Sequence, residues 1–173
     1  MWLFPASDIK GVKFSMAEPG FFIEFIELRA RWPIRAYSDL APRTCETLWN
    51  ALKSPVLETA VHAMFAGPEI MMGLTGPAQN FDPKAIPNEN QTCFPAPGEC
   101  LWFYQGKNAM HGLPDELWEI GIFYDAGGRT FGPLGWTPVN IFGRVSEDLD
   151  GFAEACRAIR LEGAKSIRFG RID

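Results

Sequence analysis

His62, Glu69 and Arg129 are the residues whose side chains are best suited to chemistry in this chain of 173 residues. An imidazole titrates near neutral pH, so His62 could serve as a general base or hold a ligand. A nearby carboxylate such as Glu69 would make an acid–base pair with it. The competing interpretation of His62 is an ordinary hydrogen-bonded histidine on a half-buried strand.

Large apolar residues accompany these polar ones and could line a groove. Ligand sites are mostly apolar and contain a few convergent polar groups. Strand alternation places His62 and Met64 on one face. For any single apolar residue, ordinary core packing is the alternative. The apolar set is Met64, Met71, Met72, Phe94, Trp102, Phe131 and Trp136. The predicted ligand-binding residues are His62, Met64, Glu69, Trp102, Arg129 and Trp136.

Other kinds of site are not indicated. The two histidines, His62 and His111, are far apart in the sequence, and no Cys-x-x-Cys pattern occurs, so we predict neither a metal site nor a cofactor. No Ser, Cys or Thr stands in a nucleophile motif. Gly127-Gly128 is typical of a hairpin turn and is too short for a phosphate-binding loop.

The composition favours one folded β domain. Hydrophobic residues make up 47% of the chain and charged residues 21%, which is ordinary for a globular protein. The 14 Phe and 6 Trp favour strands, and the 14 Pro and 17 Gly favour frequent turns. The net charge of −5 opposes non-specific nucleic-acid binding, which depends on neutralising phosphates.

The sequence predicts a cytosolic protein without a membrane partner. Its first residues lack a basic and apolar leader pattern, and no run reaches the ~18 apolar residues that span a bilayer. The four cysteines are therefore expected to be reduced thiols. Cys45 and Cys156 fall on apolar helix faces, whereas Cys93 and Cys100 flank a proline-rich turn.

Alternating and apolar runs predict a mainly β chain with long loops at 75–92 and 106–116, and a peripheral arm at 1–20. The predicted strands are 21–30, 32–38, 58–66, 69–74, 100–105, 117–125, 129–131, 139–145 and 165–172.

Two stretches change to a helical period. Residues 39–53 carry apolar side chains at helical spacing, with Pro42 in the first turn, where its missing N–H costs nothing. Residues 148–161 repeat the pattern and are followed by Gly163, a residue common just beyond a helix.

Two motifs suggest a family. Asp-Leu-Ala-Pro-Arg-Thr-Cys-Glu-Thr-Leu at 39–48 resembles the D-x-x-P-x-T-x-E-N-F start of the first helix in cyclophilins. Asn-Ile-Phe-Gly-Arg-Val at 140–145 resembles their V-F-G-x-V strand. The resemblance implies a closed eight-stranded antiparallel barrel capped by two α-helices, formed by residues 21–173.

The middle of the chain is more similar to a group of uncharacterised bacterial cyclophilin-like proteins. The similarity lies in Val-His-Ala at 61–63, in Pro-Ala-Pro-Gly-Glu at 95–99 before Leu-Trp-Phe-Tyr at 101–104, and in the closing segment 162–169. For that group the resemblance implies no known reaction.

The resemblance also indicates that prolyl isomerase activity is absent. True cyclophilins carry an F-H-R-I-I-x-G-F-M-x-Q-G-G segment whose Arg polarises the prolyl amide, and amide rotation has a barrier of ~18–20 kcal/mol. Aligning His62 with the family His places Ala63 at the Arg, and a shift of one residue places Met64 there. Neither side chain can donate a hydrogen bond.

Three functions are compatible with these residues. The first is binding of a small organic molecule or short peptide near His62, Trp102 and Trp136, without isomerase activity. The second is an enzyme with weak isomerase activity, or one that uses His62 and Glu69 as acid and base. The third is assembly into a homo-oligomer, because the aromatic content exceeds the evident need of one barrel interior.

Overall fold

The computed structural model describes residues 20–173, so the arm expected at 1–20 lies outside the described residues except for Gly20. The helices are α1 (Pro42–Ala51), η1 (Gly76–Ala78), η2 (Pro83–Ala85) and α2 (Leu149–Glu162), of which η1 and η2 are single 3-10 turns. The strands are β1 (Gly20–Phe25), β2 (Ala30–Ala36), β3 (Val56–His62), β4 (Glu69–Gly73), β5 (Gln91–Thr92), β6 (Glu99–Gln105), β7 (Leu117–Phe123), β8 (Phe131–Gly132), β9 (Gly135–Trp136), β10 (Val139–Val145) and β11 (Lys165–Ile172).

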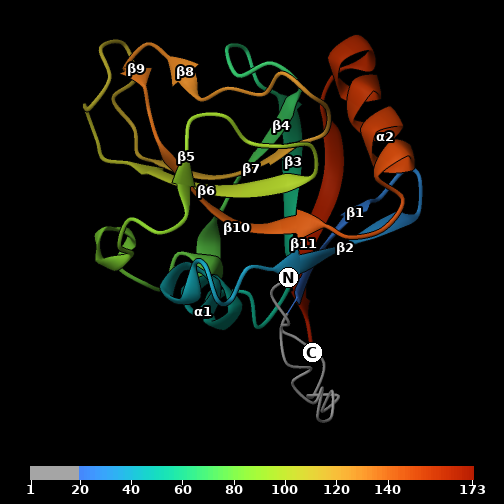
Figure 1. Ribbon diagram of the computed structural model, residues 1–173, viewed down its shortest axis with the longest axis horizontal. Helices are drawn as coiled ribbons and strands as arrows, with labels where there is room; N and C mark the ends of the chain where they lie inside the picture. Colours follow the sequence, from blue (N-terminus) through green and yellow to red (C-terminus); the bar gives the residue numbers. More distant parts are fainter. Residues whose placement is uncertain (1–19) are drawn as a thin grey trace, which may run out of the picture.

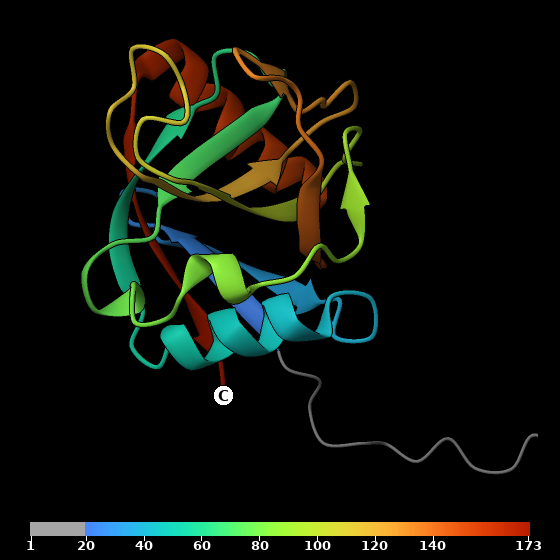
Figure 2. The ribbon, with the colours of Figure 1, turned by 90° about the vertical axis from the view of Figure 1, so that its left-hand side faces the viewer.

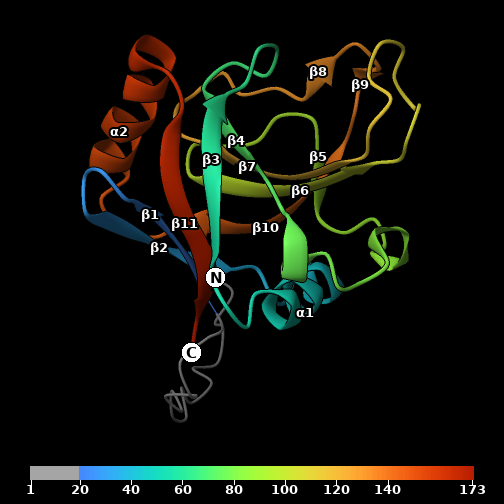
Figure 3. The same cartoon turned by 180° about the vertical axis from the view of Figure 1, so that it is seen from behind.

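Eight strands close into an antiparallel barrel (Figure 1). Their order is β2-β1-β11-β3-β4-β7-β6-β10, and β10 pairs back with β2. The view from behind shows β3 between β11 and β4 (Figure 3). The short β5 pairs with β10, and β8 and β9 form a separate hairpin. The predicted eight-stranded antiparallel barrel is confirmed.

The seam between β2 and β10 depends on a glycine. Only three residue pairs join the two strands, and Gly143 lies opposite Ala36. A Cβ on Gly143 would come within 2.7 Å of the Arg35 carbonyl oxygen, which is closer than real Cβ atoms approach. Glycine at this position therefore lets the two backbones meet and the barrel close.

Aromatic side chains fill the interior and connect it to both helices. Phe21 packs edge-on against Phe142 at a centroid distance of 5.4 Å. The ring centroid of Phe152 in α2 lies 5.7 Å from that of Trp32, and the ring centroid of Trp49 in α1 lies 6.0 Å from that of Phe21. Figure 2 shows α1 below the barrel and α2 at the opposite end, so the predicted pair of capping helices is confirmed.

Several predicted strand bounds differ from the structure, and two of them differ most. The run 21–30 is not one strand, because the chain turns at 26–29 with Arg29 at a positive φ of 51°. Leu28 is exposed in that turn, so its apolar character gave no indication of a break. The strand expected at 58–66 spans Val56–His62 instead, and the chain then leaves the sheet before β4 begins.

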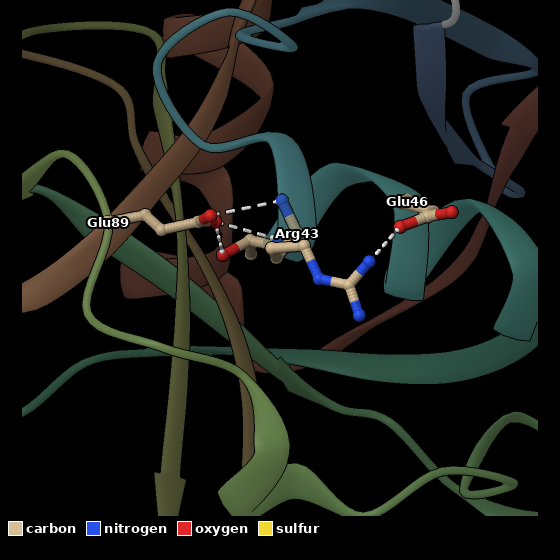
Figure 4. A network of polar contacts seen from close by, with 4 residues as sticks. Arg43, Glu46 and Glu89 are labelled. Carbon is tan, nitrogen blue, oxygen red and sulfur yellow. Dashed lines mark hydrogen bonds and ion pairs between the residues drawn. The ribbon is translucent and has the colours of Figure 1, made fainter.

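The loop 75–92 anchors the start of α1, whose own N-terminal residue supplies no side-chain cap. The Glu89 carboxylate accepts hydrogen bonds from the backbone N–H groups of Arg43 and Thr44 and from the Thr44 hydroxyl, at 2.8–3.0 Å (Figure 4). Partial burial opposes ionisation of Glu89, but these hydrogen bonds prevail and its pKa is lowered. A residue distant in the sequence thus satisfies the free amides of the first helical turn.

The remaining composition-based expectations concern thiols and membranes. The four cysteines are unbonded, and Cys45, Cys100 and Cys156 are buried. Within residues 20–173, none of the helices is long and apolar enough to cross a bilayer.

Candidate functional site

The outer face of the barrel wall formed by β4, β7 and β6 carries an unusual set of residues. In the strand register, Glu69 lies opposite Phe123, Met71 opposite Gly121, and Phe103 opposite Glu119. Alternate residues of a strand share a face, so these side chains point away from the packed interior. This wall is the floor of the candidate site.

Three loop segments rise beside the floor and border an open cavity of about 540 Å³. They are 63–68 after β3, 106–116 between β6 and β7, and 130–137 with the β8–β9 hairpin, all at the same end of the barrel (Figure 1). The lining is predominantly apolar. Its apolar members are Val61, Ala63, Met64, Phe65, Ala66, Met71, Leu101, Phe103, Met110, Leu113, Leu117, Phe131, Pro133, Leu134 and Val139.

Glu69 is the most unusual residue of the floor. Its exposed fraction is only 3%, and its buried Oε1 atom has no hydrogen-bond partner within residues 20–173. Gly121 on the neighbouring strand makes room for it, because a Cβ there would collide with Glu69 Oε1. A buried carboxyl group without a partner is costly unless it is protonated or meets a ligand.

A second carboxyl group shares this environment. Glu119 has an exposed fraction of 9%, and burial raises its pKa to about 7. Burial also raises the pKa of Glu69 well above the ordinary value, and the charge of Glu119 raises it further. Among the described residues, neither Lys nor Arg lines the cavity. The two carboxyls therefore hold protons at pH values where exposed glutamates are ionised.

Gln105 adds an amide to the same floor. It is 4% exposed, and neither its Nε2 nor its Oε1 atom has a hydrogen-bond partner among the described residues. It comes from β6, two residues beyond Phe103, and lies opposite Leu117. The cavity thus holds three buried polar side chains, and those of Glu69 and Gln105 have unpartnered atoms.

His62 reaches the cavity edge, but its ring is occupied. The Nδ1 atom lies 2.8 Å from the Ala63 carbonyl oxygen, and Nε2 lies 2.9 Å from the Tyr124 hydroxyl. A carbonyl can only accept, so Nδ1 carries the hydrogen and in the neutral ring Nε2 accepts from Tyr124. The structure thus shows His62 as a hydrogen-bonded histidine on a partly buried strand end.

The structure brings together three of the six predicted ligand-binding residues. His62, Met64 and Glu69 line the cavity, with Met64 87% exposed at its rim. Trp102 instead faces the interior, where it packs against Phe81 and Trp118.

The other two predicted residues lie outside the lining. Arg129 is exposed and has its guanidinium beside Gly67. Trp136 is 54% exposed and packs on Phe94 and Phe131, the second of which does line the cavity.

Sequence reasoning missed Glu119 and Gln105. In Leu-Trp-Glu-Ile at 117–120, a glutamate between apolar residues is typical of a strand with one solvated face. The signal that could have found it is Gly121 two residues later on the same face, because a strand glycine often marks a close approach.

Among residues 20–173, no three His, Cys, Asp or Glu side chains gather in a way that could hold a metal ion.

The fold is shared with solved structures of low sequence identity. The structure of McbB in complex with tryptophan matches with a TM-score of 0.61 and 19% identity over 87% of this chain, which spans only 44% of the McbB chain. The Mimivirus cyclophilin matches with a TM-score of 0.55 and 12% identity, over 95% of this chain and 92% of that one. The hypothetical protein AF2241 from Archaeoglobus fulgidus matches with a TM-score of 0.50 and 18% identity, over 92% and 98%.

These likenesses show a cyclophilin-like fold and nothing of activity. No curated protein matches the chain by sequence. One family model does match, and it covers residues 27–171, from the turn before β2 to the end of the last strand. With its cyclophilin-like barrel, the chain therefore belongs to the family described as "Protein of unknown function (DUF3830)".

Proposed function

We propose that this protein binds a small organic molecule or short peptide in the cavity on the outer barrel wall, and that it lacks prolyl isomerase activity. The observation that carries the proposal is an apolar cavity of about 540 Å³ whose floor holds unpartnered polar atoms of Glu69 and Gln105. The volume falls within the range typical of small-molecule sites.

The polar atoms of the floor favour a ligand because, without one, they are buried without hydrogen bonds, which costs free energy. Each buried polar group without a partner costs about 1–3 kcal/mol. A ligand that satisfies Glu69 Oε1 and the Gln105 amide would recover part of that cost. The apolar lining would add affinity at about 25 cal/mol per Å² of buried apolar surface.

The same wall argues against prolyl isomerisation. Ala63 and Met64, which stand where the cyclophilin resemblance places the catalytic Arg, both line the cavity and carry no charge. The ionisable groups on the floor are carboxyls, which cannot replace a fixed cation. Arg129 keeps its exposed side chain outside the lining.

Blocking the cavity tests the binding proposal. A library of small apolar molecules, including the tryptophan that McbB holds in its complex, is screened by thermal denaturation. We expect at least one compound to raise the melting temperature of the wild-type protein and not that of Val61→Trp, which fills the cavity wall. The control is Leu57→Trp, an exposed position on the same strand outside the lining, where the shift should persist.

Failure of a broad library to stabilise the protein would contradict the proposal, and so would an equal loss of the shift in both variants. The isomerase part is tested with a proline-containing peptide, for which we expect the uncatalysed rate. Catalysis that a competing cyclic peptide abolishes would overturn it.

A further inference from the structure

We infer that the cavity takes an organic amine, with its ammonium group against Glu69 and Glu119 and its apolar body against the surrounding wall. This inference rests on the proposed function and names its ligand class. Three features of the cavity support it: the acidic character of its titratable groups, the geometry of its floor and its unpartnered hydrogen-bond acceptors.

The titratable groups that face the cavity are acidic or already engaged. They are Glu69 from β4, Glu119 from β7 and His62 from the end of β3, and both ring nitrogens of His62 have protein partners. The loops beside the floor contribute apolar side chains, Thr130 and Thr137, and no Lys or Arg, to the lining of the described cavity. Buried carboxylates need a countercharge, and residues 20–173 place none in the lining, so a cationic ligand is suited to supply it.

The geometry of the floor suits a small cationic head. Glu69 and Glu119 come from paired strands, and Gly121 between them removes the side chain that would fill the space beside Glu69. Gln105 is a diagonal neighbour of Glu119 across β6 and β7, which places it within roughly 7–8 Å by backbone geometry. An ammonium group carries two or three N–H donors, so it can bond to more than one acceptor of such a cluster.

The charge state of the pair predicts how binding depends on pH. Raised pKa values mean that the empty site holds protons near neutral pH. An ammonium ion favours the ionised carboxyls, so its binding releases protons, and its affinity rises with pH until the amine itself loses its charge.

The test uses three probes with one apolar body and different heads: naphthylethylamine, naphthylethanol and naphthylacetate. Titration calorimetry at neutral pH should show the amine binding at least about tenfold more tightly than the alcohol, with the acetate weakest, because buried charge-assisted contacts are strong. Repeating the amine titration in two buffers of different ionisation enthalpy should reveal released protons.

Isosteric variants separate charge from shape. Glu69→Gln and Glu119→Gln keep the side-chain volume, and we expect each to lower amine affinity by about tenfold while alcohol affinity stays within about twofold. Circular dichroism establishes that both variants fold, and the double variant should show no proton release.

Equal binding of amine and alcohol to the wild-type protein would overturn this inference and leave the proposed function standing. Amine selectivity that survives in the double variant would also overturn it. Absence of binding by all three probes, together with an unproductive library screen, would count against both the inference and the proposed function.

Discussion

At the scale of single residues, the distinctive feature of the molecule is a pair of buried carboxyl groups without basic partners among the described residues. Glu69 and Glu119 are 3% and 9% exposed, yet the described residues provide neither with an ion pair. Glu24 on the same barrel is typical of a surface glutamate, because its carboxylate forms ion pairs with Arg31 and Arg168 at 3.0 Å. A pair of buried glutamates without such partners costs stability, which is typical of a functional site.

This cost predicts a pH dependence of stability. Burial raises the pKa of Glu119 from 4.5 to about 7, so the folded state binds its proton more tightly than the unfolded state does. The resulting stabilisation is full below pH 4.5 and is lost as the pH rises through about 7. Between these limits we expect Glu119 to contribute a decrease of up to about 3 kcal/mol in the free energy of unfolding.

Urea denaturation at about pH 5 and about pH 8 measures this decrease, and Glu119→Gln should reduce it by most of that amount. Carboxyls with lowered pKa values, such as Asp125, lose their contribution at lower pH and are common to both proteins. An identical pH profile for wild type and variant would show that Glu119 is ionised normally in the folded state.

Gly121 gives a second prediction at this scale. In Gly121→Ala the new Cβ would lie 2.9 Å from Leu101 Cγ and would collide with the Glu69 carboxyl group. We expect a loss of about 1–3 kcal/mol in the free energy of unfolding, typical of overpacking. The control is Gly132→Ala, where a Cβ would meet nothing within 4 Å, and its stability should stay within about 0.5 kcal/mol of wild type. Equal effects would mean that Gly121 does not shape the floor.

At the scale of elements, the spacing of apolar residues predicted the helices better than it predicted which face of a strand points into the core. The helical spacing and Pro42 identified α1, and Gly163 identified the end of α2, because local backbone rules decide those points. Leu-Trp-Phe-Tyr at 101–104 is apolar on both faces, so alternation could not tell which side faces the core. The structure turns Trp102 inward and Leu101 and Phe103 toward the cavity.

The cap that the distant Glu89 provides for α1 belongs to the same scale. Figure 4 shows Glu89 and Glu46, the two residues whose substitution tests it. Glu89→Ala removes the acceptor for the Arg43 and Thr44 amides and the buried Thr44 hydroxyl, so we expect a loss of about 1–2 kcal/mol in the free energy of unfolding. Glu46→Ala breaks only the exposed pair with Arg43 and should cost at most about 0.5 kcal/mol. Chemical denaturation compares them, and equal losses would contradict the capping role.

At the scale of the whole molecule, the barrel and the site follow from different physics. The strands were predictable because apolar residues such as Phe21 and Phe142 repeat with turn signals along the chain. That the strands close into a barrel was implied by the resemblance of segments 39–48 and 140–145 to cyclophilins. The cavity was not predictable, because it is bordered by segments 106–116 and 130–137, which are distant in the sequence from one another and from β4. The pattern of apolar and polar residues does not show where a loop packs, so the sequence around Glu119 is typical of a strand with one solvated face.

Binding of a ligand in this cavity can be detected directly through its methionines. Met64, Met71 and Met110 line the cavity, whereas Met72 is 3% exposed and belongs to the interior core. In methyl-labelled protein titrated with naphthylethylamine, we expect the NMR signals of Met64, Met71 and Met110 to shift together in a saturable way while that of Met72 stays in place. Saturable binding that leaves the NMR signals of the three lining methyl groups unchanged would contradict binding in this cavity.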